Sequence, residues 1–93
     1  MNTLNTKVVL VTGASRGIGA AIAKKLASEG AKVIINYAGA QNEADQTVQA
    51  IKDNGGDAIA LKADVSKAAE VTTLFDAAIA HYGRIDVLIN NAS

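Results

Sequence analysis

The chain lacks cysteine and proline entirely, and aromatic residues make up only 3% of its 93 positions. Without cysteine it can form neither a disulfide framework nor a thiolate metal site. Few large rings are available to fill a core, and alanine dominates the apolar residues. Because small side chains let helices approach a sheet closely, this composition favours helices packed tightly on a sheet.

Neither sign of charge is in excess, and no long hydrophobic run is present. Nine lysines and arginines balance nine aspartates and glutamates, so the charge balance does not point to nucleic acid or a membrane surface. No apolar run approaches the ~20 residues that span a bilayer, and the start of the chain does not read as a signal peptide. Because 49% of the residues are hydrophobic, we expect one folded domain over 1–93, located in the cytoplasm.

Short apolar runs alternate with segments of helical periodicity along the chain. The predicted strands cover 7–12, 33–36, 58–63 and 85–90, with a helical pattern between each pair. Glycines stand where each helix is expected to end, at Gly30, Gly55 and Gly83. Ser66 is the expected N-cap of the third helix. The strict alternation of strands and helices predicts an α/β fold with a parallel sheet and right-handed crossovers.

A glycine-rich turn joins the first predicted strand to the first predicted helix. The apolar run Val8 to Thr12 is followed by Gly13, Gly17 and Gly19, and the helical pattern begins there. Glycines let the backbone pass close to a ligand, and a helix N-terminus offers free N–H groups and partial positive charge. This strand–turn–helix context predicts a cradle for a pyrophosphate group. The alternative is a tight turn without a ligand.

The same segment also matches two other motifs. Gly13 to Gly17 fits the G-x-S-x-G pattern of a hydrolase nucleophile, which needs an acid and a histidine later in the chain. The sole histidine, His81, falls within the third helical pattern, where a solvated position is the simpler interpretation. The hydrolase motif also normally follows several strands rather than the first. A P-loop is excluded because no Gly-Lys-Ser/Thr follows.

The end of the second predicted strand bears on the choice of cofactor. An NAD site places an acid there, about 20 residues beyond the glycines, to bind the ribose 2′-hydroxyl. This chain has Asn36-Tyr37-Ala38 instead, and its next acid is Glu43. Arg16 in the glycine loop can supply a cation to a 2′-phosphate; the alternative is a solvated turn residue. The pattern therefore favours NADP(H) over NAD(H).

Polar residues also follow the third and fourth predicted strands. Asp64 and Val65 end the third strand, and Asn90, Asn91 and Ala92 end the fourth. Ligands of open parallel sheets bind beyond these carboxyl ends. A carboxylate at position 64 could accept a bond from an adenine amino group or could belong to a turn. Asn91 could bind the cofactor or tie neighbouring loops together.

Together these motifs resemble the short-chain dehydrogenase/reductase family, and in particular reductases of the 3-oxoacyl-carrier-protein reductase type. The resemblance rests on Thr12 to Gly19, on Asp64-Val65 and on Asn90 to Ala92, and it spans the chain after Thr6. It implies the first four strands and three helices of a Rossmann-type sheet, in the order 3-2-1-4. The first two helices would cover one face and the third helix the other.

Carried over to this chain, the resemblance also implies cofactor-binding roles for individual residues. The glycine loop would hold the phosphates and the adenosine ribose, the second strand's end would flank the 2′-phosphate, and the later motifs would contact adenine and the nicotinamide ribose. The residues of the glycine loop are Gly13, Ser15, Arg16, Gly17, Ile18 and Gly19, and those beside the 2′-phosphate are Asn36, Tyr37 and Ala38. Asp64 and Val65 would contact adenine, and Asn91 and Ala92 would line the nicotinamide ribose. One departure is Ser93, where the family usually has glycine.

No residue of this chain matches the family's catalytic positions. The family uses a serine, a Tyr-x-x-x-Lys pair and an asparagine further along, whereas neither Tyr37 nor Tyr82 is followed by lysine four positions later. We therefore expect the cofactor-binding part of an NADP(H)-dependent oxidoreductase, as a fragment that is inactive alone and carries no metal. The complete enzyme would act on a small carbonyl or alcohol substrate as a homo-oligomer. The alternative is a non-catalytic nucleotide-binding or assembly module.

The same interpretation predicts a poorly covered edge strand. In the family's sheet a further strand would pair beside 85–90, so we expect Val87, Leu88 and Ile89 to be incompletely buried. An apolar edge strand of this kind can pair with another chain.

Overall fold

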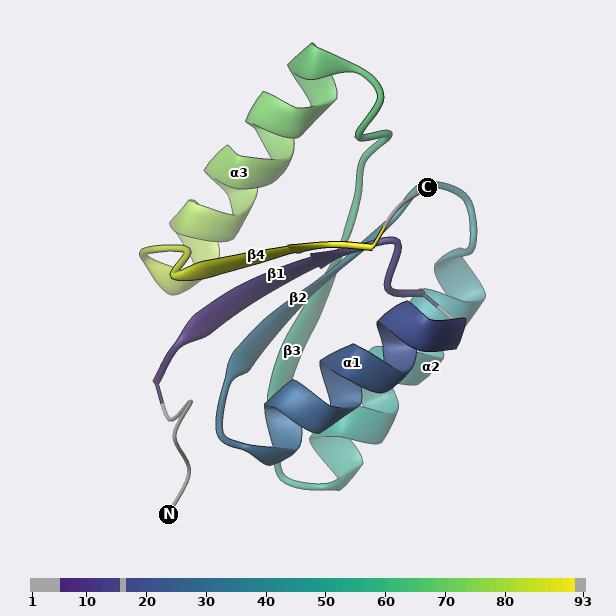
Figure 1. Ribbon diagram of the computed structural model, residues 1–93, viewed down its shortest axis with the longest axis vertical. Helices are drawn as coiled ribbons and strands as arrows, with labels where there is room; N and C mark the ends of the chain where they lie inside the picture. Colours follow the sequence, from purple (N-terminus) through teal and green to yellow (C-terminus); the bar gives the residue numbers. More distant parts are fainter. Residues whose placement is uncertain (1–5, 16, 92–93) are drawn as a thin grey trace.

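The structure is a computed structural model and describes residues 6–15 and 17–91 of the chain. Four parallel strands form a single sheet in the order β3-β2-β1-β4, as predicted. Three helices connect the strands (Figure 1). In chain order the elements are β1 (Val8–Thr12), α1 (Gly17–Ser28), β2 (Lys32–Tyr37), α2 (Gln41–Asp53), β3 (Asp57–Lys62), α3 (Ala68–Tyr82) and β4 (Val87–Asn90).

The helices divide between the two faces of the sheet as expected. On one face α1 and α2 pack through Ala23, Ala27, Ala44 and Ile51 against alternate residues of β1 and β2. On the other face, α3 packs through Leu74 and Ala78 against the intervening strand residues (Figure 1). Because both faces are covered, β1 is buried along its whole length. This explains its continuous rather than alternating apolar sequence.

The start of α3 corrects one prediction. Ser66 is not the N-cap: the helix begins at Ala68, its N-cap residue is Lys67, and no side chain makes a capping hydrogen bond. Ser66 instead donates both its main-chain N–H and its hydroxyl to Asp64 Oδ1. The side chain of Glu70 accepts the main-chain N–H of Asp64. The serine is thus used to close the turn after β3 rather than to start the helix.

The fourth strand begins later than predicted, at Val87 rather than at residue 85. The reason lies in Asp86, whose carboxylate accepts the Val8 N–H at 2.8 Å. A side chain therefore takes the place of the strand carbonyl at the start of the β1–β4 pairing. The other strand boundaries differ from the prediction by about one residue, which is ordinary for strand ends.

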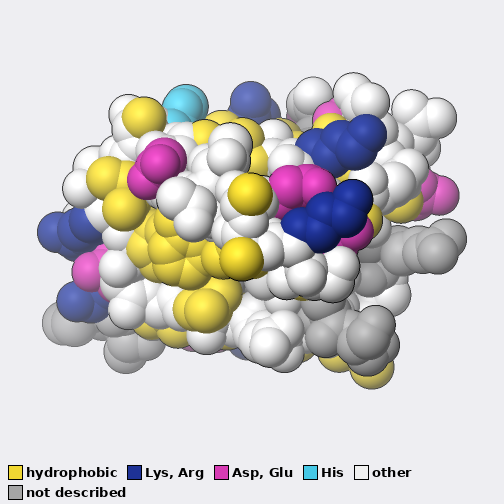
Figure 2. Space-filling view, turned by 90° about the horizontal axis from the view of Figure 1, so that it is seen from above, with side chains coloured by type: hydrophobic (Ala, Val, Ile, Leu, Met, Phe, Trp, Pro, Cys, Tyr) yellow, Lys and Arg dark blue, Asp and Glu magenta, His cyan; other side chains and the backbone are white. Residues whose placement is uncertain are grey.

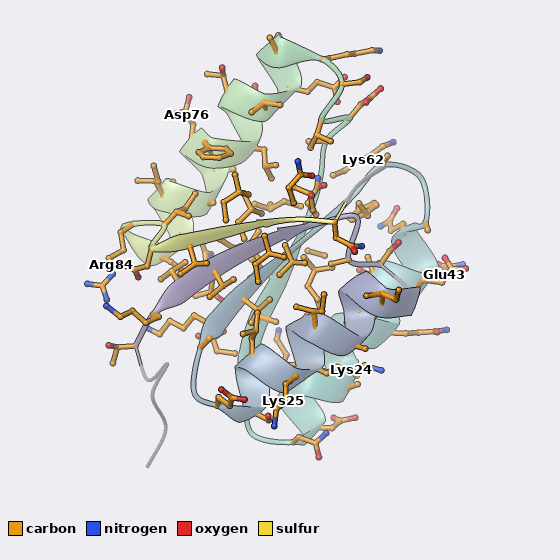
Figure 3. All side chains as sticks on the ribbon, in the orientation of Figure 1. Lys24, Lys25, Glu43, Lys62, Asp76 and Arg84 are labelled. Atoms are coloured by element: carbon orange, nitrogen blue, oxygen red, sulfur yellow. The ribbon has the colours of Figure 1, made fainter. Side chains whose placement is uncertain are left out.

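The edge strand β4, which pairs with β1, carries exposed apolar side chains, as the sequence predicted. Val87 is 39% exposed and Leu88 is 51% exposed, and Ile79 on α3 is 45% exposed. Figure 2 views the molecule from above and shows hydrophobic side chains gathered into one patch among polar ones. Charged side chains such as Lys25, Lys62 and Asp76 point outward around the molecule (Figure 3). Within the described residues, no helix combines the length and apolarity needed to cross a membrane.

Candidate nucleotide-binding site

A crevice lies at the carboxyl ends of the strands, where β1 separates β2 from β4. It has a volume of about 370 Å³. Its walls come from the glycine loop, from the ends of β2 and β4, and from the turn after β3. The lining residues are Gly13, Asn36, Ala38, Ala63, Asp64, Val65, Ser66 and Asn90. This is the topological switch point of the sheet, the position at which open α/β folds bind their ligands.

The glycine loop has the geometry of a phosphate cradle. Gly13 and Gly17 adopt φ values of +62° and +64°, which side chains disfavour. At Gly19 a Cβ atom would lie 2.5 Å from the Gly13 carbonyl oxygen and 2.6 Å from Asn91 Nδ2, so only glycine fits. The first turn of α1 carries no acidic residue. The helix N-terminus is therefore free of the charge that would repel an anion.

Asn36 ties three segments together beneath the crevice. Its side chain is only 2% exposed, and Nδ2 donates to the carbonyls of Ala63 at 3.1 Å and Leu61 at 3.4 Å. Oδ1 accepts the Gly13 N–H at 3.4 Å, and the Asn36 carbonyl accepts the Ala14 N–H. The amide is thus used to join β2, the end of β3 and the glycine loop. Asn36 also lines the crevice, and its place beside a 2′-phosphate stays a prediction.

The two residues after Asn36 are placed differently from each other. Tyr37 is 8% exposed and lies in the core under α1 and α2. Ala38 is exposed and lines the crevice. At the end of β2 the crevice wall is therefore formed by a methyl group, with no carboxylate in the place where an NAD site would have one.

Asp64 faces the crevice from the turn after β3. Hydrogen bonds from the Ser66 hydroxyl and N–H hold the pKa of its carboxyl below the usual value, and Lys67 adds a smaller attraction. Both of these hydrogen bonds go to Oδ1. Asp64 is therefore an ionised acceptor at the mouth of the crevice near neutral pH.

Asn91 ties the end of β4 to the glycine loop through two hydrogen bonds, and its neighbour Asn90 lines the crevice. Asn91 Nδ2 donates to the Gly13 carbonyl at 3.1 Å, and the Asn91 N–H donates to the Thr12 hydroxyl at 3.0 Å. The Thr12 hydroxyl in turn lies 3.1 Å from Asn90 Oδ1. This network joins the ends of β1 and β4 and fixes the start of the glycine loop.

Among the predicted site residues, five line the crevice: Gly13, Asn36, Ala38, Asp64 and Val65. Ser15 and Gly17 line a neighbouring groove between α1 and α2, while Ile18 is 74% exposed at the start of α1. Arg16 and Ala92 lie outside the described residues. Three lining residues were missed, Ala63, Ser66 and Asn90. Each is next to a predicted residue at a strand end, so widening each motif by one position would have found them.

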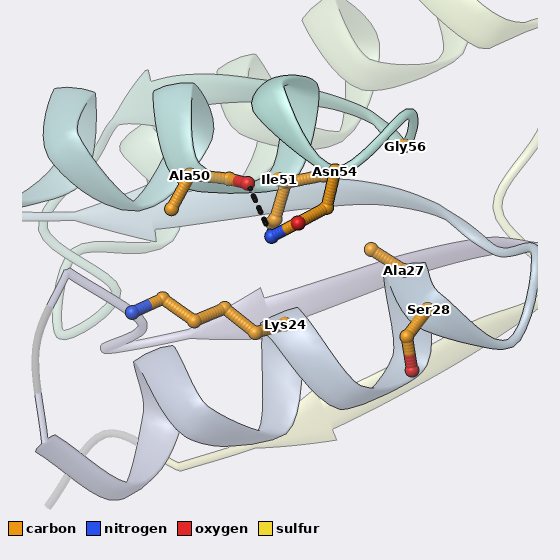
Figure 4. Close-up of a pocket in the computed structure, with 7 residues that line it drawn as sticks. All are labelled: Lys24, Ala27, Ser28, Ala50, Ile51, Asn54 and Gly56. Atoms are coloured by element: carbon orange, nitrogen blue, oxygen red, sulfur yellow. Dashed lines mark hydrogen bonds between the residues drawn. The ribbon is translucent and has the colours of Figure 1, made fainter.

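A further cavity, of about 190 Å³, lies between α1 and α2 (Figure 4). It is lined by Lys24, Ala27, Ser28, Ala50, Ile51, Asn54 and Gly56. Most of these belong to the last turns of the two helices, at the end of the sheet opposite the glycine loop. Asn54 Nδ2 donates to the Ala50 carbonyl there, so its amide is already engaged. Nothing in this cavity matches the features of a nucleotide site.

Neither tyrosine lies at the crevice. Tyr37 is in the core, and the Tyr82 hydroxyl donates to Asp57 at the start of β3, the opposite end of the sheet. His81 is an exposed helix residue whose ring contacts Tyr82, as the solvated interpretation expected. Over residues 6–15 and 17–91, no group of three or more His, Asp or Glu side chains is arranged to hold a metal ion.

Comparisons with known proteins agree with this geometry. The profile of the family described as short chain dehydrogenase matches residues 7–93. Elsinochrome reductase 1 of Elsinoe fawcettii is 56% identical over 89 residues, which is 96% of this chain and 33% of that protein. Versicolorin reductase of Emericella nidulans is 52% identical over 89 residues, 96% of this chain and 34% of that protein.

Solved structures agree as well. A short chain dehydrogenase from Burkholderia cenocepacia in complex with NADP superposes with a TM-score of 0.94 at 44% identity, covering 99% of this chain and 38% of that one. A dehydrogenase/reductase from Sinorhizobium meliloti gives 0.94 at 42% identity, covering 97% and 36%. The chain therefore belongs to the short-chain dehydrogenase/reductase family of oxidoreductases. It spans about a third of the length of the relatives that it matches.

Proposed function

We propose that this chain forms the NADP(H)-binding part of an oxidoreductase that transfers hydride between nicotinamide and a carbonyl or alcohol. The observation that carries the proposal is the crevice at the switch point, which joins the glycine loop to the ends of β2, β3 and β4. The close approach at Gly19 and the positive φ values at Gly13 and Gly17 fit a pyrophosphate rather than a side chain.

Different residues at the crevice would bind different parts of the nucleotide. The N-terminal turn of α1 would hold the pyrophosphate through main-chain N–H groups. Both protein hydrogen bonds to the Asp64 carboxylate go to Oδ1, so within the described part of the chain Oδ2 is available to an adenine amino group. The bound nicotinamide supplies the hydride acceptor or donor. Several relatives carry the name reductase, which favours reduction of a carbonyl.

The preference for NADP(H) over NAD(H) rests on two features. Ala38 places no carboxylate at the end of β2, and Arg16 provides a cation in the glycine loop. A solved relative in complex with NADP supports the same preference. Removing the arginine should therefore reduce the affinity for NADPH more than the affinity for NADH.

Titration with both nucleotides tests this proposal. We expect NADPH to bind about tenfold more tightly than NADH, or ~1.4 kcal/mol, and Arg16→Ala to shrink that ratio. Lys25→Ala is the control, because it removes an exposed cation from the far end of α1. Equal affinities for the two nucleotides in the wild-type chain would contradict the preference.

A second variant pair tests the cradle. Gly19→Ala should abolish nucleotide binding, because the added methyl collides with the Gly13 carbonyl and with Asn91. In Gly39→Ala the added methyl meets nothing within 4 Å, so binding should persist. Circular dichroism of both variants separates loss of the cradle from loss of the fold. Unchanged NADPH affinity in a folded Gly19→Ala variant would show that the glycine loop does not bind the pyrophosphate.

We also propose that the 93-residue chain binds nucleotide without catalysing turnover. Within the described residues, no tyrosine lines the crevice to donate a proton, since Tyr37 and Tyr82 both lie elsewhere. An NADPH-dependent reduction assay with the 93-residue chain should show no activity. Activity that Gly19→Ala abolishes would contradict this part. Nucleotide binding without activity in any longer protein that carries this chain would favour the non-catalytic module instead.

A further inference from the structure

One buried hydroxyl connects α2 to the glycine loop from outside the crevice. Thr47 is 4% exposed, and its Oγ1 lies 3.1 Å from the Ser15 carbonyl oxygen and 3.0 Å from the Glu43 carbonyl oxygen. A threonine hydroxyl carries one proton and can donate it to either acceptor. The Glu43 contact is the usual bond of a helical threonine to the residue four positions earlier. The Ser15 contact crosses 32 residues of sequence.

Two other helical threonines lack this second acceptor. Thr72 and Thr73 on α3 donate to the carbonyls four positions earlier, those of Ala68 and Ala69, and both are exposed. Their hydrogen bonds stay within one helix. Among these three threonines, only Thr47 bonds to another element, and its side chain is buried whereas the other two are exposed. A buried hydrogen bond of this kind is costly to leave unmade.

The contact completes a series of restraints on the glycine loop. Asn36 and Asn91 hold the N–H and the carbonyl of Gly13, and the Asn36 carbonyl holds the Ala14 N–H. Thr47 holds the carbonyl of Ser15, the next residue along. The loop is thus restrained from β2, from the end of β4 and from α2. Phosphate binding by main-chain N–H groups requires such restraint, because the groups must point at the ligand before it arrives.

We propose that Thr47 is a positioning residue for nucleotide binding, whose hydroxyl holds the Ser15 carbonyl and keeps the glycine loop in its phosphate-binding conformation. The proposal rests on the function proposed above. Thr47 does not line the crevice itself. It lies instead at a groove of about 340 Å³ between α1 and α2, together with Ser15, Gly17, Lys24 and Glu43, so it acts through the loop rather than on the nucleotide.

Three variants of the full chain test the role of the hydroxyl. Thr47→Val keeps the shape but removes the hydroxyl, Thr47→Ser keeps the hydroxyl, and Thr73→Val removes a matched helical hydroxyl away from the loop. We expect Thr47→Val to weaken NADPH binding about 5- to 10-fold, the size of one lost hydrogen bond. Thr47→Ser and Thr73→Val should stay within about twofold of the wild type.

Thermal midpoints measured without nucleotide distinguish positioning from folding. If Thr47 only stabilises α2, Thr47→Val will shift the midpoint and leave the NADPH dissociation constant unchanged well below that midpoint. That result would overturn the proposal. Equal weakening in Thr47→Ser, or in Thr73→Val, would overturn it too, because the hydroxyl at position 47 would then not be the cause. If the wild-type chain fails to bind NADPH at all, the proposed function falls, and this proposal falls with it.

Discussion

The two neighbours of β1 are held to it in different ways. On one side, β2 has buried residues facing both helix layers, with Val33 and Ile35 toward α1 and α2 and Ile34 toward α3. On the other side, β4 pairs with β1 in register, yet Val87 and Leu88 are 39% and 51% exposed. Strand β1 therefore lies between β2, whose side chains are buried under helices on both faces, and β4, whose side chains are partly exposed to solvent.

Hydrogen bonds at both ends of β4 add to its limited apolar burial, to which Ile89 contributes. At its start the Asp86 carboxylate accepts the Val8 N–H and the Arg84 Nε–H. At its end, the Thr12 hydroxyl links Asn90 and Asn91 to β1. Hydrogen bonds are directional and set the register of a strand, whereas burial supplies most of the free energy. The β4 side is therefore well positioned but weakly stabilised, and its Asn90 lines the candidate nucleotide-binding crevice.

The sharpest test compares two leucines that sit opposite each other on adjacent strands. Leu10 and Leu88 are register partners on the α3 side of the sheet, but Leu10 is 0% exposed and Leu88 is 51% exposed. Leu10→Ala should cost about 2–5 kcal/mol of unfolding free energy. Leu88→Ala should cost about 1 kcal/mol or less, since half of the side chain is already in water. Urea denaturation of both variants measures the difference.

If the two substitutions reduce the unfolding free energy equally, the Leu88 side chain must be buried in solution by something other than this chain's own fold. Sedimentation velocity of the wild type would then reveal whether a second copy covers β4. Leu88→Lys would reverse such an association, because a charged residue on an edge strand opposes pairing.

A smaller effect is expected at the start of β4, where acid should loosen the Asp86 contacts. The Val8 N–H, and to a lesser degree Arg84, hold the pKa of the Asp86 carboxyl below its usual value. A lowered folded pKa contributes stability above the unfolded pKa of about 4, and this contribution disappears as the pH falls through the folded pKa. The stability difference between wild type and Asp86→Asn should therefore shrink from pH 7 to pH 3.

Denaturant titrations at several pH values provide this measurement, with Asp76→Asn as the matched control. Asp76 is an exposed carboxylate on α3, pointing away from the sheet (Figure 3). A difference between wild type and Asp86→Asn that stays constant down to pH 3 would show that Asp86 does not tether β4 through its charge.

The smallest effect concerns Tyr82, which ties α3 to β3. Burial, and then the hydrogen bond to Asp57, raise the pKa of the Tyr82 hydroxyl. A raised folded pKa gives stability that is complete below the unfolded value of about 10 and is lost as the pH rises above it. Tyr82→Phe should cost about 0.5–1 kcal/mol at pH 7. Above pH 10 the variant and the wild type should converge, because the wild type alone loses this contribution.

The comparison is internally controlled, because Tyr37 and every lysine are present in both proteins. Thermal midpoints at pH 7, 9 and 11 would follow the convergence. A gap that widens with pH would mean that the phenol ionises more easily in the folded chain than in the unfolded one.

Much of the fold was predictable from local pattern. The alternation of apolar runs with helical stripes predicted the element order and a parallel sheet, and the family resemblance implied which helices share a face. The errors fell where a side chain competes with the main chain. Ser66 turned toward Asp64 instead of capping α3, and Asp86 replaced a strand carbonyl at the start of β4. Periodicity carries no information about such competition.

The sequence predicted where the candidate site lies, at the carboxyl ends of the strands, but not which hydrogen bonds its residues make. Gly13, Ala38 and Asp64, which were predicted to bind a cofactor, lie together at the crevice, and their binding roles stay predictions. Asn36 lines the crevice as well, but the pattern did not predict that its amide is buried and bonded to the end of β3. Which way a side chain points at a strand end depends on the register of the next strand. That register brings Asn36 opposite Leu61, 25 residues later in the chain.

By itself, the sequence determined the features that depend on neighbouring residues: the strands, the helices, and the glycine turn whose conformation excludes side chains. Only the tertiary structure decided which polar groups meet across the sheet. Thr47 meets Ser15, Asn91 meets Gly13, and Asn36 meets Ala63, each across more than 25 residues of chain. Such pairs form because packing brings distant backbone groups within 3–3.5 Å of a side chain, and a buried polar group must find a partner wherever the fold places one.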